Sequence, residues 1–112
     1  MIVHRKEKAV SKYTLEVRYR LRAHDCKEFE RILDREVIPL AAELGLTLGG
    51  VWKSVTGKVG EYVEHWEFNS LEEFENDWNK LINDSRLQEV FKTTGPMVED
   101  ETFTLLAPFL ED

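Results

Sequence analysis

Two stretches of the chain alternate between two faces at the period of a β-strand. Over residues 13–22 the apolar positions are Tyr13, Leu15, Val17, Tyr19 and Leu21. Over residues 61–68 one face carries Tyr62, Glu64, Trp66 and Phe68, and the other carries Glu61, Val63, His65 and Glu67. Because the two faces differ in polarity, we expect an antiparallel sheet that is covered on one side.

Two more strands are predicted from weaker patterns. Residues 46–56 form the first, and Gly49-Gly50 within it indicates a bulge or a close approach of another backbone. A glycine turn over residues 57–60 follows, so this strand should pair as a hairpin with the strand that comes next. Residues 101–109 form the last strand, which Pro108 marks as ending at a sheet edge.

A long helix is predicted between the first two strands. Asp25 with Glu28 three residues later has the form of a capping box, and apolar residues at helical spacing continue to Gly45. Pro39 lies inside this segment, where it supplies no N–H and crowds the carbonyl group four residues back. We therefore expect a kink or local unwinding near residues 35–38, with two helices that meet at Pro39 as the alternative.

A second helical region is predicted between the third and fourth strands. Ser70 and Glu73 form a capping box ahead of a helix with an apolar stripe. A shorter helix follows, which starts at Asp84 or Ser85 and stops at Gly95-Pro96. The resulting order is the split βαββαβ pattern. It predicts an α+β fold of ferredoxin-like type, in which a four-stranded antiparallel sheet has its helices on one face.

Length and composition allow one domain with a single core. We assign it to residues 13–112 and interpret residues 1–12 as a tail or a short edge segment, since they show no sustained period. Residues 1–22 carry a net charge of +5 within a chain whose total is −7. An acidic protein is a poor nucleic-acid binder. We interpret the basic start as a partner of an anion, or of acidic surface on its own fold or on a partner subunit.

Other compositional features narrow the class of protein. No apolar run approaches the ~20 residues that span a bilayer, and the N-terminus has no apolar signal segment. Cys26 is the only cysteine, which excludes an internal disulfide and favours a reducing, cytoplasmic setting. His4, His24 and His65 lack ligand-like spacing, so neither a metal site nor a cofactor is predicted.

A family likeness is carried by six segments: Leu15–Leu21 (LEVRYRL), Leu48–Trp52 (LGGVW), Gly57, His65–Phe74 (HWEFNSLEEF), Asp84–Leu87 and Leu105–Pro108. In this order, over about residues 13–109, they resemble the NIPSNAP family of the dimeric α/β-barrel superfamily. The resemblance implies a homodimer whose two sheets face each other and close a barrel-like cavity. It implies no single activity, because the wider superfamily includes cofactor-free monooxygenases, haem-degrading enzymes, isomerases and stress-response proteins.

The resemblance also bears on single residues. Arg18 matches the arginine position of the first strand in NIPSNAP-like sequences. The third strand of that family often carries a histidine two residues before the tryptophan. Here that position is Glu64, and the histidine stands at His65 on the opposite face. A role carried over from the family's histidine therefore has no matching residue in this chain.

The polar face of the sheet is the candidate site. It would carry Glu16, Arg18 and Arg20 of the first strand, Val63, His65 and Glu67 of the third, and Trp52 of the hairpin. We predict two catalytic residues: His65 as a general base, and Arg18, or Arg20 in its place, as the group that holds an anionic oxygen. The other residues of this face are predicted ligand contacts. Ion pairs without a substrate are the alternative. With the faces reversed, Glu64 and Trp66 would line the cavity.

The sequence thus predicts an intracellular homodimer that binds a small molecule or a partner in the cavity between two subunits. One alternative is a cofactor-independent enzyme, of monooxygenase or isomerase type, that acts on a small aromatic or keto acid. Another is a structural interaction module. No nucleic-acid or membrane partner is expected.

Overall fold

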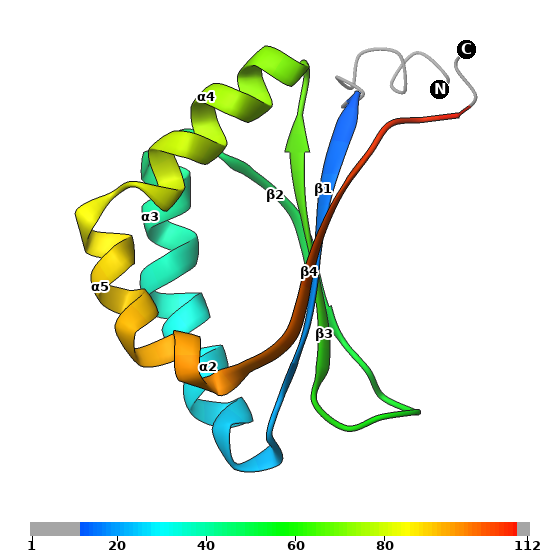
Figure 1. Cartoon of the computed structure of the whole chain (residues 1–112), viewed down its shortest axis with the longest axis vertical. Coiled ribbons are helices and arrows are strands. Elements are labelled where there is room, and N and C mark those ends of the chain that lie inside the picture. The colour runs from blue at the N-terminus through cyan, green and yellow to red at the C-terminus, as the bar shows by residue number, and fades with distance from the viewer. Residues whose placement is uncertain (1–11, 110–112) are drawn as a thin grey trace, which may run out of the picture.

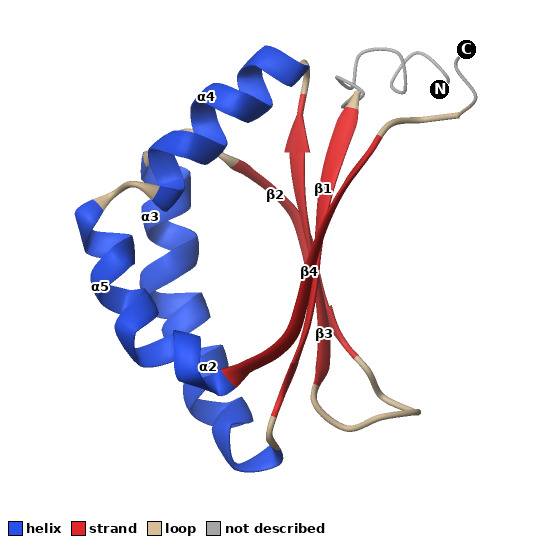
Figure 2. Ribbon diagram, in the orientation of Figure 1, coloured by secondary structure: helices blue, strands red, loops and turns tan. Residues whose placement is uncertain are grey.

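The computed structural model describes residues 12–109, which form one antiparallel sheet with helices on one side (Figures 1 and 2). The spatial order is β2-β3-β1-β4, with the strands β1 (Tyr13–Leu21), β2 (Thr47–Lys53), β3 (Glu61–Phe68) and β4 (Val98–Leu106). This is the predicted ferredoxin-like α+β arrangement. Except for Lys12, the predicted tail of residues 1–12 lies outside the described residues.

The helix-covered face of the sheet forms the core, as the alternation predicts. The buried side chains on this face are Leu15, Val17, Tyr19 and Leu21 of β1 and Tyr62, Trp66 and Phe68 of β3. Full burial of an apolar side chain of this size contributes about 1.5–3 kcal/mol. The opposite face carries the charged positions, and no described element covers it (Figure 1).

A continuous helix joins β1 to β2, with a wider turn in its middle. The segment consists of α2 (Cys26–Ile32), a π-helical turn (Leu33–Val37) and α3 (Ile38–Glu43). In the π turn the Ile38 N–H donates to the Leu33 carbonyl oxygen, five residues back. Pro39 accounts for the change, because it has no N–H and its ring crowds the carbonyl group four residues earlier. The predicted unwinding near residues 35–38 therefore occurs as a π turn rather than a break.

The predicted capping box of Asp25 and Glu28 is wrong. A 3-10 turn (Ala23–Asp25) precedes α2, so Asp25 already has helical dihedral angles (φ −95°, ψ −13°), and its side chain forms no cap hydrogen bond. Glu28 instead pairs with Arg31, with 2.7 Å between Oε2 and Nη2. A side-chain cap requires an extended residue at the helix start, and the early turn removes that conformation.

The remaining helices, α4 (Leu71–Ile82) and α5 (Ser85–Thr94), both begin at side-chain caps. The Glu73 N–H donates to Ser70 Oγ at 3.0 Å, which confirms Ser70 as the cap. The Glu73 carboxylate accepts from the Asn69 N–H at 3.0 Å, one residue before the cap residue that a regular capping box uses. Asp84, one of the two predicted starts, caps α5, because its Oδ1 accepts from the Arg86 N–H at 2.8 Å. None of the helices within residues 12–109 combines the length and apolar character of a membrane span.

Two of the strands contain a bulge. In β2 the register shifts between Leu48 and Gly50, as the glycine pair predicts. The last strand begins at Val98, earlier than the predicted residue 101, and it contains a bulge at Asp100. The backbone of Asp100 is left-handed (φ 52°), a conformation that aspartate tolerates better than most residues.

The bulge in β4 determines which acidic side chain reaches each face of the sheet. Two residues, Asp100 and Glu101, lie opposite the single residue Tyr19. Asp100 reaches the uncovered face, where its Oδ2 lies 2.7 Å from Arg20 Nη2. Glu101 lies on the helix side, where it lines a cavity.

Candidate functional site

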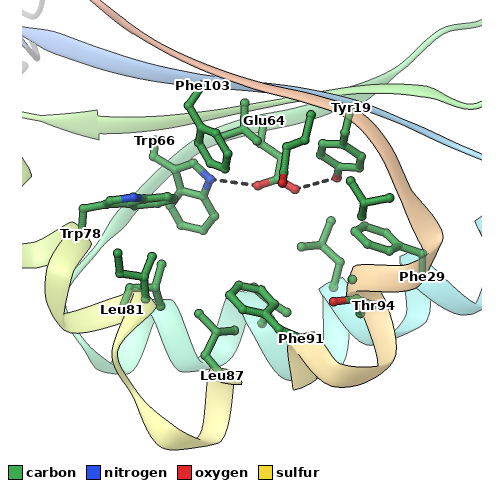
Figure 3. A pocket seen from close by; sticks show the side chains of 17 residues that line it. Tyr19, Phe29, Glu64, Trp66, Trp78, Leu81, Leu87, Phe91, Thr94 and Phe103 are labelled. Atoms are coloured by element: carbon green, nitrogen blue, oxygen red, sulfur yellow. Dashed lines mark hydrogen bonds between the residues drawn. The ribbon is translucent and has the colours of Figure 1, made fainter. Parts of the chain in front are cut away.

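A cavity of about 590 Å³ lies between the sheet and the helices (Figure 3). Its walls come from β1, β3 and β4 on one side and from α2, the π turn, α4 and α5 on the other. Most of the lining is apolar, and the aromatic members are Tyr19, Phe29, Trp66, Trp78, Phe91 and Phe103. Such a volume and lining are typical of sites for small organic ligands.

Glu64 is the charged group at the floor of this cavity. The alternation of β3 turns it toward the helices, and it is 8% exposed. The Tyr19 hydroxyl group donates to its Oε2 at 2.6 Å, and Trp66 Nε1 donates to its Oε1 at 2.9 Å (dashed lines in Figure 3). Burial raises the pKa of the Glu64 carboxyl group, and the two hydrogen bonds offset part of that rise.

The Tyr19 hydroxyl group is a fixed donor to Glu64. The Tyr19 ring stacks on Tyr62 with 5.6 Å between centroids and packs against Phe29 at 5.4 Å. Burial, and after it the charge of Glu64, raises the pKa of the Tyr19 hydroxyl group. The phenol therefore stays protonated near neutral pH and keeps donating to the carboxylate.

The mouth of the cavity lies beside β4, one of the two edge strands of the sheet. Ile82 of α4, Phe91 of α5 and Phe103 of β4 line the cavity and are 37% to 52% exposed. Glu101 also lines the cavity and is exposed, so it belongs to this rim. Partial burial, followed by the charge of Glu64, raises the pKa of the Glu101 carboxyl group. The cavity thus has two carboxyl groups, one buried at its floor and one at its rim.

The Glu64 carboxylate can accept more hydrogen bonds than the protein donates to it. A carboxylate has about four acceptor positions, and Glu64 uses two of them for Tyr19 and Trp66. It can therefore accept a further hydrogen bond, or a proton, from a bound molecule. No group of three metal-ligating side chains occurs in the described part of the chain.

The predicted site residues lie on the other, uncovered face of the sheet. Glu16 connects two of them, since its Oε2 lies 2.7 Å from Arg18 Nε and its Oε1 lies 2.9 Å from His65 Nε2. Arg18, and after it His65, lowers the pKa of Glu16. The Trp52 indole meets the His65 ring edge-on, with 4.8 Å between centroids. The structure thus brings four of the seven predicted residues together.

The other three predicted residues are more scattered on this face. Arg20 pairs with Asp100, Glu67 accepts from Thr14 Oγ1 at 2.7 Å, and Val63 lies opposite Arg18 in the strand register. A second, shallower cavity of about 480 Å³ is lined in part by Arg18, Arg20, Trp52 and Val63. His65 is in the lining of neither cavity, and its role as a base stays a prediction.

From the sequence, Glu64 was a site residue only in the alternative with reversed faces, and Glu101 was not predicted as a site residue. A signal for Glu64 was present, because it is the acidic residue on an otherwise aromatic face of its strand, and buried acidic groups are rare. Glu101 shares a face with Phe103, but the sequence does not show that a cavity opens beside them.

Residues 13–110 match the model of the NIPSNAP family. The structure resembles an uncharacterized NIPSNAP domain protein from Burkholderia xenovorans (22% identity, TM-score 0.78, 89% of this chain and 99% of that one). It also resembles a NIPSNAP family protein with unknown function from Agrobacterium tumefaciens (22% identity, TM-score 0.78, 88% of each chain). A second NIPSNAP family protein of that organism is 25% identical (TM-score 0.77, 86% of this chain and 91% of that one). No curated protein matches the sequence.

Proposed function

The chain belongs to the NIPSNAP family, and we propose that it binds a small, largely apolar molecule in the cavity between its sheet and its helices. The observation that carries this proposal is an aromatic cavity with one buried carboxyl group, Glu64, at its floor. Cavities of roughly 300–1,000 Å³ with a few well-placed polar groups are the usual sites for small ligands.

The two parts of the cavity have different roles in this proposal. The aromatic side chains Trp66, Trp78 and Phe103 remove ligand surface from water, which contributes about 25 cal/mol for each Å² of apolar area. Glu64 orients the ligand, because Tyr19 and Trp66 already hold its carboxylate in one position.

We further propose that two copies of the chain associate through the uncovered faces of their sheets. Trp52 supports this, since 51% of this large apolar residue is exposed on that face. The pairs that Glu16 forms with Arg18 and His65 suit a polar interface, in which such contacts can also form between subunits. The single cysteine, Cys26, favours a cytoplasmic location for this dimer.

A second candidate function is a cofactor-independent enzyme that acts on a small aromatic or keto acid. One observation favours it: when His65 Nε2 carries the proton shared with Glu16, Nδ1 is the acceptor nitrogen and can serve as a base. Arg18, beside the same carboxylate, would hold an anionic oxygen of the substrate. This function places the ligand on the uncovered face.

Fluorescence titration with N-phenyl-1-naphthylamine, an uncharged probe that brightens in apolar sites, tests the cavity. We expect saturable binding by the wild-type protein. Phe103→Ala removes an aromatic wall at the mouth and should weaken probe binding about tenfold. Because Phe103 is 52% exposed, this truncation should cost little folding stability.

His65→Ala is the matched comparison on the opposite face of the sheet. If the probe occupies the cavity, its affinity should stay within about twofold of the wild-type value. Binding that His65→Ala abolishes and Phe103→Ala leaves intact would instead place the ligand on the uncovered face. A wild-type protein without saturable binding would contradict the proposed site.

A further inference from the structure

The charges of the cavity narrow the class of ligand. In an extension that rests on the proposed function, we infer that the cavity binds an arylalkylamine in its ammonium form, in preference to a neutral molecule or a carboxylate of the same shape. Glu64 and Glu101 face the ammonium group, and the aromatic walls enclose the hydrocarbon part.

Both carboxyl groups of the cavity are without a cationic partner in residues 12–109. Glu64 is 8% exposed, and the groups that bond to it, the Tyr19 hydroxyl group and the Trp66 indole N–H, are uncharged donors. Buried charges in proteins are normally paired. A carboxylate of this kind in a ligand-sized cavity therefore indicates that the ligand supplies the positive charge.

The pKa values of both cavity carboxyl groups are raised, as expected for carboxyl groups that have no cationic partner. Burial is the main cause that raises the pKa of Glu64, and it is also the main cause for Glu101, where the Glu64 charge adds to it. An ammonium group between Glu64 and Glu101 would favour the ionised forms of both carboxyl groups, because it supplies a positive charge and none of the lining side chains does.

Glu64 also has room to accept from an ammonium group. Each of its two oxygens accepts one hydrogen bond from the protein, so each retains a second lone pair. An ammonium group carries several N–H donors and can bond to more than one oxygen at once.

Aromatic rings form the wall beside Glu64 (Figure 3). Trp66 and Trp78 lie 6.4 Å apart between centroids, and Trp78 and Phe103 lie 6.1 Å apart, so the three rings are contiguous. Ring faces attract cations, and tryptophan does so most strongly. A carboxylate ligand would meet two like charges and no cationic side chain in the lining, which disfavours it.

Displacement of N-phenyl-1-naphthylamine by three compounds of one shape tests the inference. The compounds are 2-naphthylmethylamine, 2-naphthylmethanol and 2-naphthoate. We expect the amine to compete at a concentration about tenfold lower than the alcohol, and the carboxylate to compete least well. Glu64→Gln should reduce the preference for the amine over the alcohol to about twofold or less.

A second variant tests the same inference in case Glu64→Gln does not fold. Glu101→Gln changes an exposed rim residue, so the protein should fold normally while its preference for the amine falls about threefold. Glu89→Gln removes the same charge from an exposed position of α5 outside the cavity lining, and it should keep the wild-type preference.

The outcomes separate the two proposals. If the probe does not bind the wild-type protein, the proposed function fails. If the probe binds and the three compounds compete equally, or the carboxylate competes best, the cavity is a ligand site and the amine inference is overturned. An amine preference that survives in both Glu64→Gln and Glu101→Gln would also overturn it, because the carboxylates would then not be its origin.

Discussion

At the scale of single residues, one carboxyl group changes what an aromatic strand face can do. Tyr62, Glu64, Trp66 and Phe68 share the helix side of β3 and all are buried, but Glu64 alone carries a charge that must be solvated. Tyr19 and Trp66 provide hydrogen bonds without a compensating charge. The cost of burying this group should appear in the folding stability, and its size should depend on pH.

We predict that stability falls as the pH rises above the ordinary glutamate pKa of about 4.3. Burial raises the pKa of Glu64 in the folded state, so the folded protein still holds a proton that the unfolded chain has released. The unfolded state then binds fewer protons, and unfolding becomes more favourable with increasing pH until the folded-state pKa is passed. Each unit of pKa elevation corresponds to about 1.4 kcal/mol.

Urea unfolding of the wild type and of Glu64→Gln, from about pH 5 to about pH 8, measures this contribution. The variant should gain stability relative to the wild type as the pH rises, because the amide carries no charge. Its oxygen can still accept from Trp66 Nε1, and its NH2 group can donate to the Tyr19 hydroxyl oxygen, which reverses that hydrogen bond. Glu75→Gln, at an exposed position of α4, should differ from the wild type by a constant amount. A constant difference for Glu64→Gln as well would contradict the raised pKa.

The alternation of apolar and polar residues in the strands predicted which face each side chain occupies, but it did not predict what the side chains do there. It placed Arg18 and His65 on one face and Glu64 on the other, which is where the structure has them. It could not show that about 590 Å³ remains between Glu64 and the helices. That volume depends on how far apart the packed elements lie, which a strand period does not encode.

At the scale of elements, a helix start depends on the backbone of the cap residue as well as on its side chain. Ser70 and Asp84 have extended dihedral angles, and each accepts a hydrogen bond from the first turn of its helix. Asp25 has a suitable side chain, but a 3-10 turn gives it helical dihedral angles. Residue spacing alone therefore predicted the cap at Ser70 correctly and the cap at Asp25 wrongly.

We predict that Ser70→Ala lowers the free energy of unfolding by about 1 kcal/mol, because the Glu73 N–H loses its partner. Ser85→Ala is the matched variant at the start of α5. It should change the free energy by less than about 0.5 kcal/mol, since Asp84 provides that cap. Urea unfolding of the two variants gives the comparison, and equal losses would contradict the assignment of the caps.

The irregular parts of the elements differ in how far the sequence predicts them. Pro39 predicted the altered helix, because proline restricts the backbone and lacks an N–H. Gly49-Gly50 predicted the bulge in β2, because glycine allows backbone conformations that other residues avoid. Asp100 gave no such signal. Its left-handed conformation accompanies a contact with Arg20 on β1, which only the tertiary structure brings near.

At the scale of the whole molecule, the order of elements predicted the topology, since few sheet arrangements accommodate a βαββαβ chain. The sheet within residues 12–109 is covered by helices on one side only. The other side carries Trp52 and a set of charged residues around Glu16. The proposed homodimer would cover this side and leave the mouth of the sheet–helix cavity accessible.

We predict that sedimentation at micromolar concentration shows twice the mass of one chain. Arg18→Glu reverses a charge on the uncovered face and, because a two-fold interface contains it twice, should weaken the dimer about tenfold or more. Arg31→Glu makes the same change on the exposed side of α2 and should leave the dimer intact. A wild-type protein that sediments as a monomer would rule out the proposed association.

The π turn and the bulge in β4 lie on facing walls of the same cavity. Leu33 and Val37 line it from the turn, and Tyr19 and Glu101 line it at the bulge. Each irregularity is one residue more than a regular element requires. The width of the cavity then depends on a different kind of change at each wall. Removing one residue at the bulge would restore a regular strand and keep the flanking side chains on their faces, whereas the π turn would persist as long as Pro39 stays in the helix. A deletion in β4 and a replacement of Pro39 would therefore be the ways to adapt this scaffold to ligands of different size.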